Sequence, residues 1–186
     1  MAASQPVAAN APRRPRFFAP LALVASFLVG MVATTLLIPA PEPPQGPAPL
    51  GWTAAVASYQ SLYVTETLSN TGQAAAETDA VLARAADEFE VALAPATQID
   101  GITFKRAQML GFRGKHMMQM AYLTPDGTPF ALCLIRTDKP DRGTKGIEMF
   151  DVAGVSWVKD GVGYLLIGGN DVGRVEDLSG SFIASL

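Results

Sequence analysis

A run of 22 consecutive residues without a charged side chain, residues 17–38, constrains this chain more than any other feature of its sequence. As an α-helix rising about 1.5 Å per residue, the run would measure roughly 33 Å, enough to cross a bilayer's hydrocarbon core of about 30 Å. A cleavable signal peptide has a shorter apolar region and a small-residue cleavage site, whereas Pro39 and Pro41 directly follow this run. We therefore expect an uncleaved transmembrane helix over residues 17–38.

The charges on either side of this run predict its orientation. Arg13, Arg14 and Arg16 precede it, and the first acidic residue of the chain, Glu42, follows it. Because basic residues beside a membrane span stay on the cytoplasmic side, we expect a single-pass protein with its N-terminus in the cytoplasm. Residues 1–16 are rich in Ala, Pro and Ser without apolar periodicity, which is typical of a disordered tail.

Residues 39–50 separate the predicted span from the rest of the chain. Residues 39–49 contain six of the chain's 14 prolines, a composition that favours extended polyproline II and acts as a semi-rigid spacer. We therefore expect a Pro-rich linker over residues 39–50, followed by one folded domain over residues 51–186 that stands outside the cytoplasm.

Apolar spacing predicts helices at both ends of this domain. Apolar residues recur at helical spacing over residues 52–63, and a second helix is expected between a cap at Thr78 or Asp79 and Pro95. A final helix is expected after a cap at Asn170 or Asp171.

Between these helices the period changes to two, which predicts strands. We expect six of them, opening at Ile102 and Phe104 and continuing over residues 116–123, 129–135, 148–152, 155–158 and 162–168, with a polar loop at residues 137–146. Adjacent hairpins give an antiparallel sheet. The expected fold class is therefore α+β, with the helices before and after the sheet covering one of its faces.

Composition excludes several classes of function. Residues 42–186 hold 11 bases and 17 acids, so this part lacks the basic surface that nucleic-acid binding requires. The single cysteine, Cys133, excludes an intrachain disulfide and lies in an apolar strand, where burial is expected. No nucleophile, base and orienting group occur together in a recognisable pattern. We expect neither an enzyme nor a bound cofactor.

One string of residues is a weak candidate for a metal site. His116, Met118 and Met120 fall on one face of a predicted strand, and an imidazole with two thioethers suits Cu(I). Methionines on both faces of the strand are equally typical of core packing, because Met fills irregular gaps. A periplasmic copper-binding protein is therefore a lesser alternative.

The first predicted helix offers candidates for a partner interface. Trp52, Tyr59 and Tyr63 lie on its apolar stripe, and aromatic side chains with a polar tip suit interfaces. Two interpretations stay open. The stripe docks on the domain's own sheet, or it pairs with a protein partner, which includes a second copy and hence a homodimer.

Three strings of the sequence together resemble a known family. These are residues 52–68, the hairpin of residues 112–135 with its Asp126-Gly127 turn, and residues 155–168, all after a single span. They resemble the extracytoplasmic part of proteobacterial transmembrane anti-sigma factors. The resemblance implies a bacterial inner-membrane protein with a periplasmic sensory domain that controls an extracytoplasmic-function sigma factor.

The family's cytoplasmic domain, which clamps the sigma factor, carries a His-x₃-Cys-x₂-Cys motif. Residues 1–16 contain neither histidine nor cysteine, so we expect this chain to lack the zinc-binding clamp. A short tail, one span and a small outer domain also suit an accessory subunit of a respiratory-type membrane complex, which is the main alternative.

Overall fold

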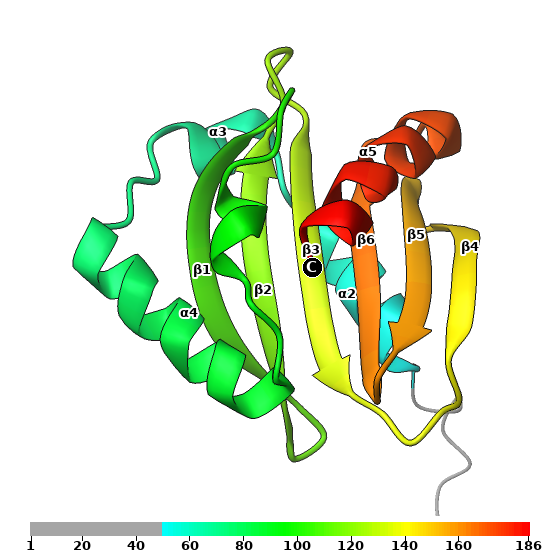
Figure 1. The fold of residues 1–186 in the computed structure, drawn as a ribbon. Coiled ribbons are helices and arrows are strands. Elements are labelled where there is room, and N and C mark those ends of the chain that lie inside the picture. Colours follow the sequence, from blue (N-terminus) through cyan, green and yellow to red (C-terminus); the bar gives the residue numbers. More distant parts are fainter. Residues whose placement is uncertain (1–49) are drawn as a thin grey trace, which may run out of the picture. The chain divides into compact units, whose positions relative to one another are not determined.

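The described part of the chain, residues 50–186, is built on a six-stranded antiparallel sheet in this computed structural model (Figure 1). The predicted tail and membrane span, and the linker up to residue 49, lie outside the described residues. The sheet has helices before and after it, which confirms the predicted α+β class. The elements in chain order are α2 (Trp52–Gln60), α3 (Thr65–Ser69), α4 (Ala75–Phe89), the 3₁₀ helix η1 (Ala94–Thr97), β1 (Thr103–Phe112), β2 (Lys115–Leu123), β3 (Pro129–Arg136), β4 (Arg142–Met149), β5 (Val152–Lys159), β6 (Val162–Gly168) and α5 (Val172–Ser185).

The strand order is β1-β2-β3-β6-β5-β4. Successive strands pair as hairpins except at one place, where β3 pairs with β6 and the chain crosses to the far edge to form β4. The crossing spans three strand spacings, about 14 Å, and residues 137–141 are long enough for it because five extended residues reach roughly 17 Å. This connection brings the end of β3 and the start of β4 to one end of the sheet.

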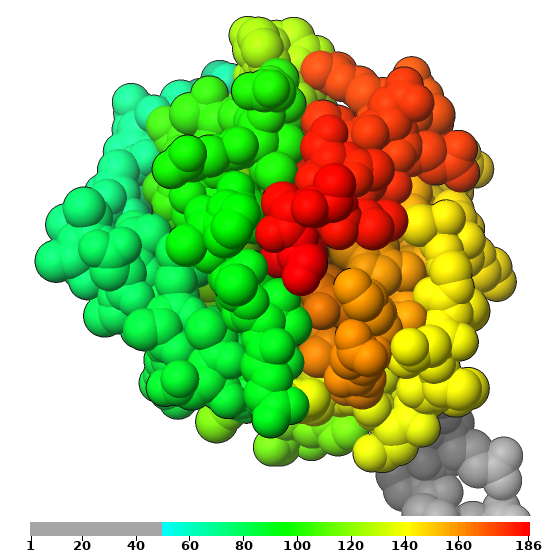
Figure 2. Space-filling view, viewed as in Figure 1, coloured from blue at the N-terminus to red at the C-terminus, as the bar shows by residue number. Residues whose placement is uncertain are grey.

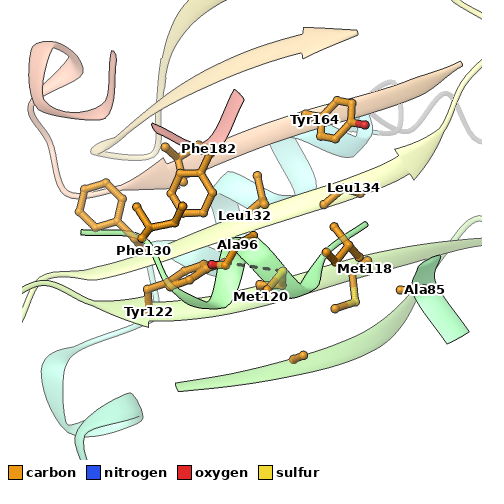
Figure 3. Close-up of a cluster of buried hydrophobic side chains, with 14 of the residues drawn as sticks. Ala85, Ala96, Met118, Met120, Tyr122, Phe130, Leu132, Leu134, Tyr164 and Phe182 are labelled. Atoms are coloured by element: carbon orange, nitrogen blue, oxygen red, sulfur yellow. Dashed lines mark hydrogen bonds between the residues drawn. The ribbon is translucent and has the colours of Figure 1, made fainter. Parts of the chain in front are cut away.

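One face of the sheet is covered by α4, η1 and α5. Figure 2 shows these elements lying over the strands, with α5 in red. The core beneath them contains Tyr122 and Phe182, whose rings meet edge to face with centroids 5.3 Å apart. The Tyr122 hydroxyl donates to the Ala96 carbonyl at 3.0 Å. This bond satisfies a fully buried phenol and joins η1 to β2. Figure 3 labels both residues, and its dashed line marks the contact of the same hydroxyl with the Met120 sulfur.

The opposite face is covered by α2 and α3, which corrects the expectation that helices cover one face. Val56 and Ala57 of α2 pack on a cluster that includes Cys133 and Leu165. Leu68 of α3 packs on Ala121 and its neighbours. The physical reason is that β3 and β6 are apolar on both sides, as strands buried on both faces are. A second helical layer keeps that side out of water.

Both predicted boundaries of the second helix differ from the structure. Helix α4 begins at Ala75, one turn before the expected cap. Thr78 is a buried residue inside the helix, and its hydroxyl donates to Gln73 Oε1 at 3.1 Å. The helix ends at Phe89 and the chain turns through a left-handed Glu90, ahead of Pro95. The predicted cap of α5 is confirmed at Asp171, whose side chain accepts from the Arg174 amide at 3.2 Å.

The fourth strand is also shifted from its predicted place. The second half of the expected polar loop, residues 142–146, belongs to β4, and the expected strand at residues 148–152 contains the turn to β5. Phe150 and Asp151 form that turn with φ angles of 54° and 61°, a left-handed pair typical of tight hairpins. As an edge strand, β4 is largely exposed, and its polar sequence follows from that exposure.

The other edge strand, β1, has part of its outer backbone paired by a side chain. Gln73 Oε1 accepts from the Ala107 amide at 2.7 Å, and Gln73 Nε2 donates to the Ala107 carbonyl at 2.9 Å. The amide group thus pairs with β1 as a further strand would. Because unpaired edge groups invite other chains to pair, this contact protects β1.

Candidate interaction surface

Helix α2 carries the three predicted interface residues, and the structure separates them. Trp52 lies against its own sheet, because a Cβ placed on Gly163 of β6 would be 3.4 Å from Trp52 Cζ2. Val56 and Ala57, one turn further on, are buried. The N-terminal half of the stripe therefore belongs to the domain's core, as the first of the two interpretations expected.

The end of α2 and its connection to α3 are different. Tyr59, Leu62 and Val64 remain 45%, 73% and 55% exposed. These three large exposed side chains lie within six positions of the chain and are here called the α2–α3 surface. Single exposed apolar residues are ordinary, but adjacent ones are typical of interaction sites.

Tyr63 supports this surface from beneath. It is partly buried against the cluster that contains Leu68, and its ring meets that of Tyr59 edge to face with centroids 5.3 Å apart. Arg106 Nη2 donates to the Tyr63 hydroxyl at 2.7 Å. Burial, with the hydrogen bond to Tyr59, raises the pKa of Tyr63 to about 12. The Tyr63 hydroxyl donates to the Tyr59 hydroxyl at 3.4 Å, which helps to hold Tyr59 in place.

Leu62 and Val64 were not among the predicted interface residues. The sequence suggested a helix through residue 63, which would turn Leu62 toward the sheet. The helix ends at Gln60 instead, where the side-chain Nε2 donates to the Pro129 carbonyl at 3.3 Å. The continuous apolar string Leu62-Tyr63-Val64 is the one signal in the sequence that indicated this exposed group.

The three copper candidates share one face of β2 but occupy different environments. The His116 side chain is 54% exposed, and its Nδ1 lies 2.7 Å from Glu88 Oε1 on α4. Met118 and Met120 are fully buried in the core, as Figure 3 shows for their side chains. Within residues 50–186, no group of three or more His, Cys, Asp or Glu side chains is arranged to hold a metal ion. A copper site therefore stays a prediction.

Cys133 is completely buried, as expected. Burial raises the pKa of its thiol to about 12, so the thiol is protonated at physiological pH. A nucleophilic cysteine requires a stabilised thiolate and access to solvent. The environment of Cys133 supplies neither, and the side chain acts as a small apolar residue between β2 and β6.

One strong polar contact joins the β2–β3 turn to α5. Arg174 Nη2 and Nη1 donate to the two carboxylate oxygens of Asp126 at 2.9 and 3.0 Å. This bidentate contact, together with a hydrogen bond from Thr124, holds the pKa of Asp126 well below its ordinary value. The groups are exposed, so the pair fixes a turn rather than forming a chemical centre.

No family model matches the chain, and no curated protein matches it either. None of the helices in residues 50–186 is both long and apolar enough to cross a membrane.

Proposed function

We propose that this chain is a membrane-anchored regulatory protein, similar to a transmembrane anti-sigma factor, whose outer domain contacts a protein partner. The observation that carries the proposal is the α2–α3 surface, where Tyr59, Leu62 and Val64 lie exposed beside a helix that is otherwise packed. In this proposal residues 17–38 anchor the chain in the bacterial inner membrane, and the domain is periplasmic.

The physical properties of this surface support a protein partner. Fully burying a leucine side chain stabilises a complex by about 1.5–3 kcal/mol, so the 73% exposed Leu62 offers a large part of that gain. Tyr59 can bury its ring and keep its hydroxyl bonded, which is why tyrosine is frequent at the centre of interfaces. Tyr63, which Arg106 holds through its hydroxyl, supports the Tyr59 ring before the partner binds.

The order of the segments supports a regulator at the membrane. An apolar span, a Pro-rich linker and a domain form a chain in which a change at the outer surface can be passed to the anchor. The sequence strings at residues 52–68 and 155–168, which carry the resemblance to anti-sigma factors, belong to α2, α3, β5 and β6. The first string includes the α2–α3 surface.

Deletion of the gene in its host tests the proposal. A regulator of a sigma factor changes the transcripts of a limited set of genes that share one promoter type. Unchanged transcripts, together with constant co-migration of the chain with a large complex in blue-native electrophoresis, would contradict the proposal and favour the accessory-subunit alternative.

A further inference from the structure

We propose that a basic groove between α2 and β4 binds the phosphate head groups of anionic phospholipids and so holds the domain against the membrane. The inference rests on the membrane anchoring in the proposed function. The groove has a volume of about 230 Å³, and its basic side chains are Lys139, Arg142 and Lys145.

The groove lies on the face of the sheet covered by α2. One wall is the start of that helix, including Trp52, and the other is the edge strand β4. In Figure 1, α2 begins behind the lower ends of β5 and β4. Ile147 and Met149 of β4 form part of an apolar floor. The three basic side chains come from the β3–β4 connection and from β4, and all three are exposed.

The charges of the groove are not neutralised within the described residues. The ion pairs in residues 50–186 use other basic side chains, and no carboxylate lines the groove. Arg142 donates to the Ser156 hydroxyl at 3.2 Å, which orients the guanidinium without removing its charge. Two acids, Asp138 and Asp141, flank these bases in the chain. Neither lines the groove or forms an ion pair with its bases, and Asp141 accepts from the Asp160 amide at 3.0 Å.

This concentration of positive charge contrasts with the rest of the domain. Residues 50–186 contain 11 basic and 16 acidic residues, a net charge of −5. A groove with three bases and no acid is therefore a local feature and not a consequence of overall composition. Phosphate fits this groove, because Arg binds phosphate oxygens through a fork of donors and Lys through a point charge.

The position of the groove in the chain favours a lipid phosphate as the ligand. Gly51, which lines the groove, is separated from the predicted span by residues 39–50. Even fully extended as polyproline II, residues 39–49 reach no further than about 34 Å, so the groove stays within reach of the membrane surface. Basic groups near a membrane are attracted to anionic head groups.

Lysine acylation of the full chain tests the proposal. The chain is reconstituted in vesicles of phosphatidylcholine, or in vesicles in which a third of the lipid is phosphatidylglycerol, and acylation rates are read by mass spectrometry. We expect Lys139 and Lys145 to react about fivefold more slowly in the anionic vesicles, with the difference lost at high salt. Lys105, which donates to the Ser69 carbonyl beside the other edge of the sheet, is the internal control and should not change.

A matched pair of variants ties the effect to the groove. Arg142→Gln removes one groove base and leaves both reporter lysines, so we expect it to lose most of the protection. Arg84→Gln removes an exposed base on α4 and should retain the protection. Equal loss in both variants would overturn the proposal, because net charge alone would then explain the effect.

Two further measurements distinguish a failure of the groove proposal from a failure of the proposed function. If inorganic phosphate protects both lysines in phosphatidylcholine vesicles as well as the anionic lipid does, the ligand is a soluble phosphate and the lipid assignment is overturned. If alkaline carbonate releases the chain from both kinds of vesicle, the anchor fails and the proposed function fails with it. Retention of the chain without protection of Lys139 and Lys145 overturns the groove proposal alone.

Discussion

Replacement of Gly168 by alanine should strongly destabilise the domain. Gly168 ends β6 and pairs with Phe130 of β3. A Cβ at this position would clash with the Pro129 carbonyl oxygen and would lie 2.6 Å from Phe130 Cγ and 2.8 Å from Phe130 Cα. Two of these atoms belong to the backbone, and the Phe130 ring is buried, so no neighbour can move without shifting the pairing of β3 with β6.

The size of this effect follows from the cost of overpacking. Added methyl groups in a packed core cost about 1–3 kcal/mol, and backbone contacts this short place Gly168→Ala at about 3 kcal/mol. For a domain of this size, that loss lowers Tm by roughly 10 °C. Thermal and urea unfolding of a fragment containing residues 50–186, followed by circular dichroism, measures both quantities.

Gly111→Ala is the matched control. Gly111 also lies in a strand, but a Cβ there meets nothing within 4 Å and its φ is not left-handed. The control should be neutral or stabilise by a few tenths of a kcal/mol to about 1 kcal/mol, because alanine restricts the unfolded chain. If Gly168→Ala unfolds within about 2 °C of the wild type, the close packing of β6 on the start of β3 is refuted.

Further predictions concern the contacts described above. The bond from Arg174 lowers the pKa of Asp126. The pair therefore stabilises the fold above the ordinary carboxyl pKa of about 3.9 and loses this contribution as the pH falls below that value. Between neutral and acidic pH, the urea midpoint should drop less in Arg174→Gln than in the wild type. Cys133, with its buried thiol of pKa about 12, should react with a thiol reagent at pH 8 only as fast as the domain unfolds, and rapid stoichiometric labelling of the native domain would contradict its burial. Gln73→Ala should lower the free energy of unfolding by about 1–3 kcal/mol, because it leaves the Ala107 amide and carbonyl unpaired. Size-exclusion chromatography should then show more self-association through β1. An unchanged monomer would contradict the role of Gln73 in protecting this edge strand.

Much of the fold was readable from the sequence because its signals are local. The strand over residues 162–168 and the cap at Asp171 are found where they were predicted. The strand over residues 129–135 also indicated that both faces of the sheet are covered. Leu132 and Leu134 lie on one of its faces and Ala131 and Cys133 on the other, so both faces are apolar. A continuous apolar strand requires a layer on each side. The expectation that the helices cover one face, which was based on their position at the two ends of the domain, did not take this requirement into account.

Other features depend on contacts that sequence spacing does not reveal. The start of β4 reads as a loop, because an exposed edge strand needs few apolar residues and Gly143 and Gly146 interrupt it. The exposure of Leu62 depends on where α2 ends, and the Gln60 side chain there bonds to Pro129, 69 residues later. Neither glycine nor proline marks that end in the sequence.

The basic groove could not be predicted from the sequence either. Its walls, Trp52 on one side and Arg142 and Lys145 on the other, are about 90 positions apart in the chain and belong to elements of different type. They meet only because β3 pairs with β6 and the chain crosses to the far edge. Strand order of this kind is set by the packing of the whole sheet.

Complementation of the gene deletion tests most directly whether the chain regulates through its α2–α3 surface. The deletion strain receives the wild type, Leu62→Glu or Arg84→Glu, expressed at equal levels in the membrane fraction. Both substitutions place a carboxylate on an exposed position, so both should fold, but only the first puts a charge where the partner is proposed to bury an apolar side chain. We expect Arg84→Glu to restore the wild-type transcripts and Leu62→Glu to leave them as in the deletion, whereas full restoration by Leu62→Glu would contradict a regulatory role for this surface.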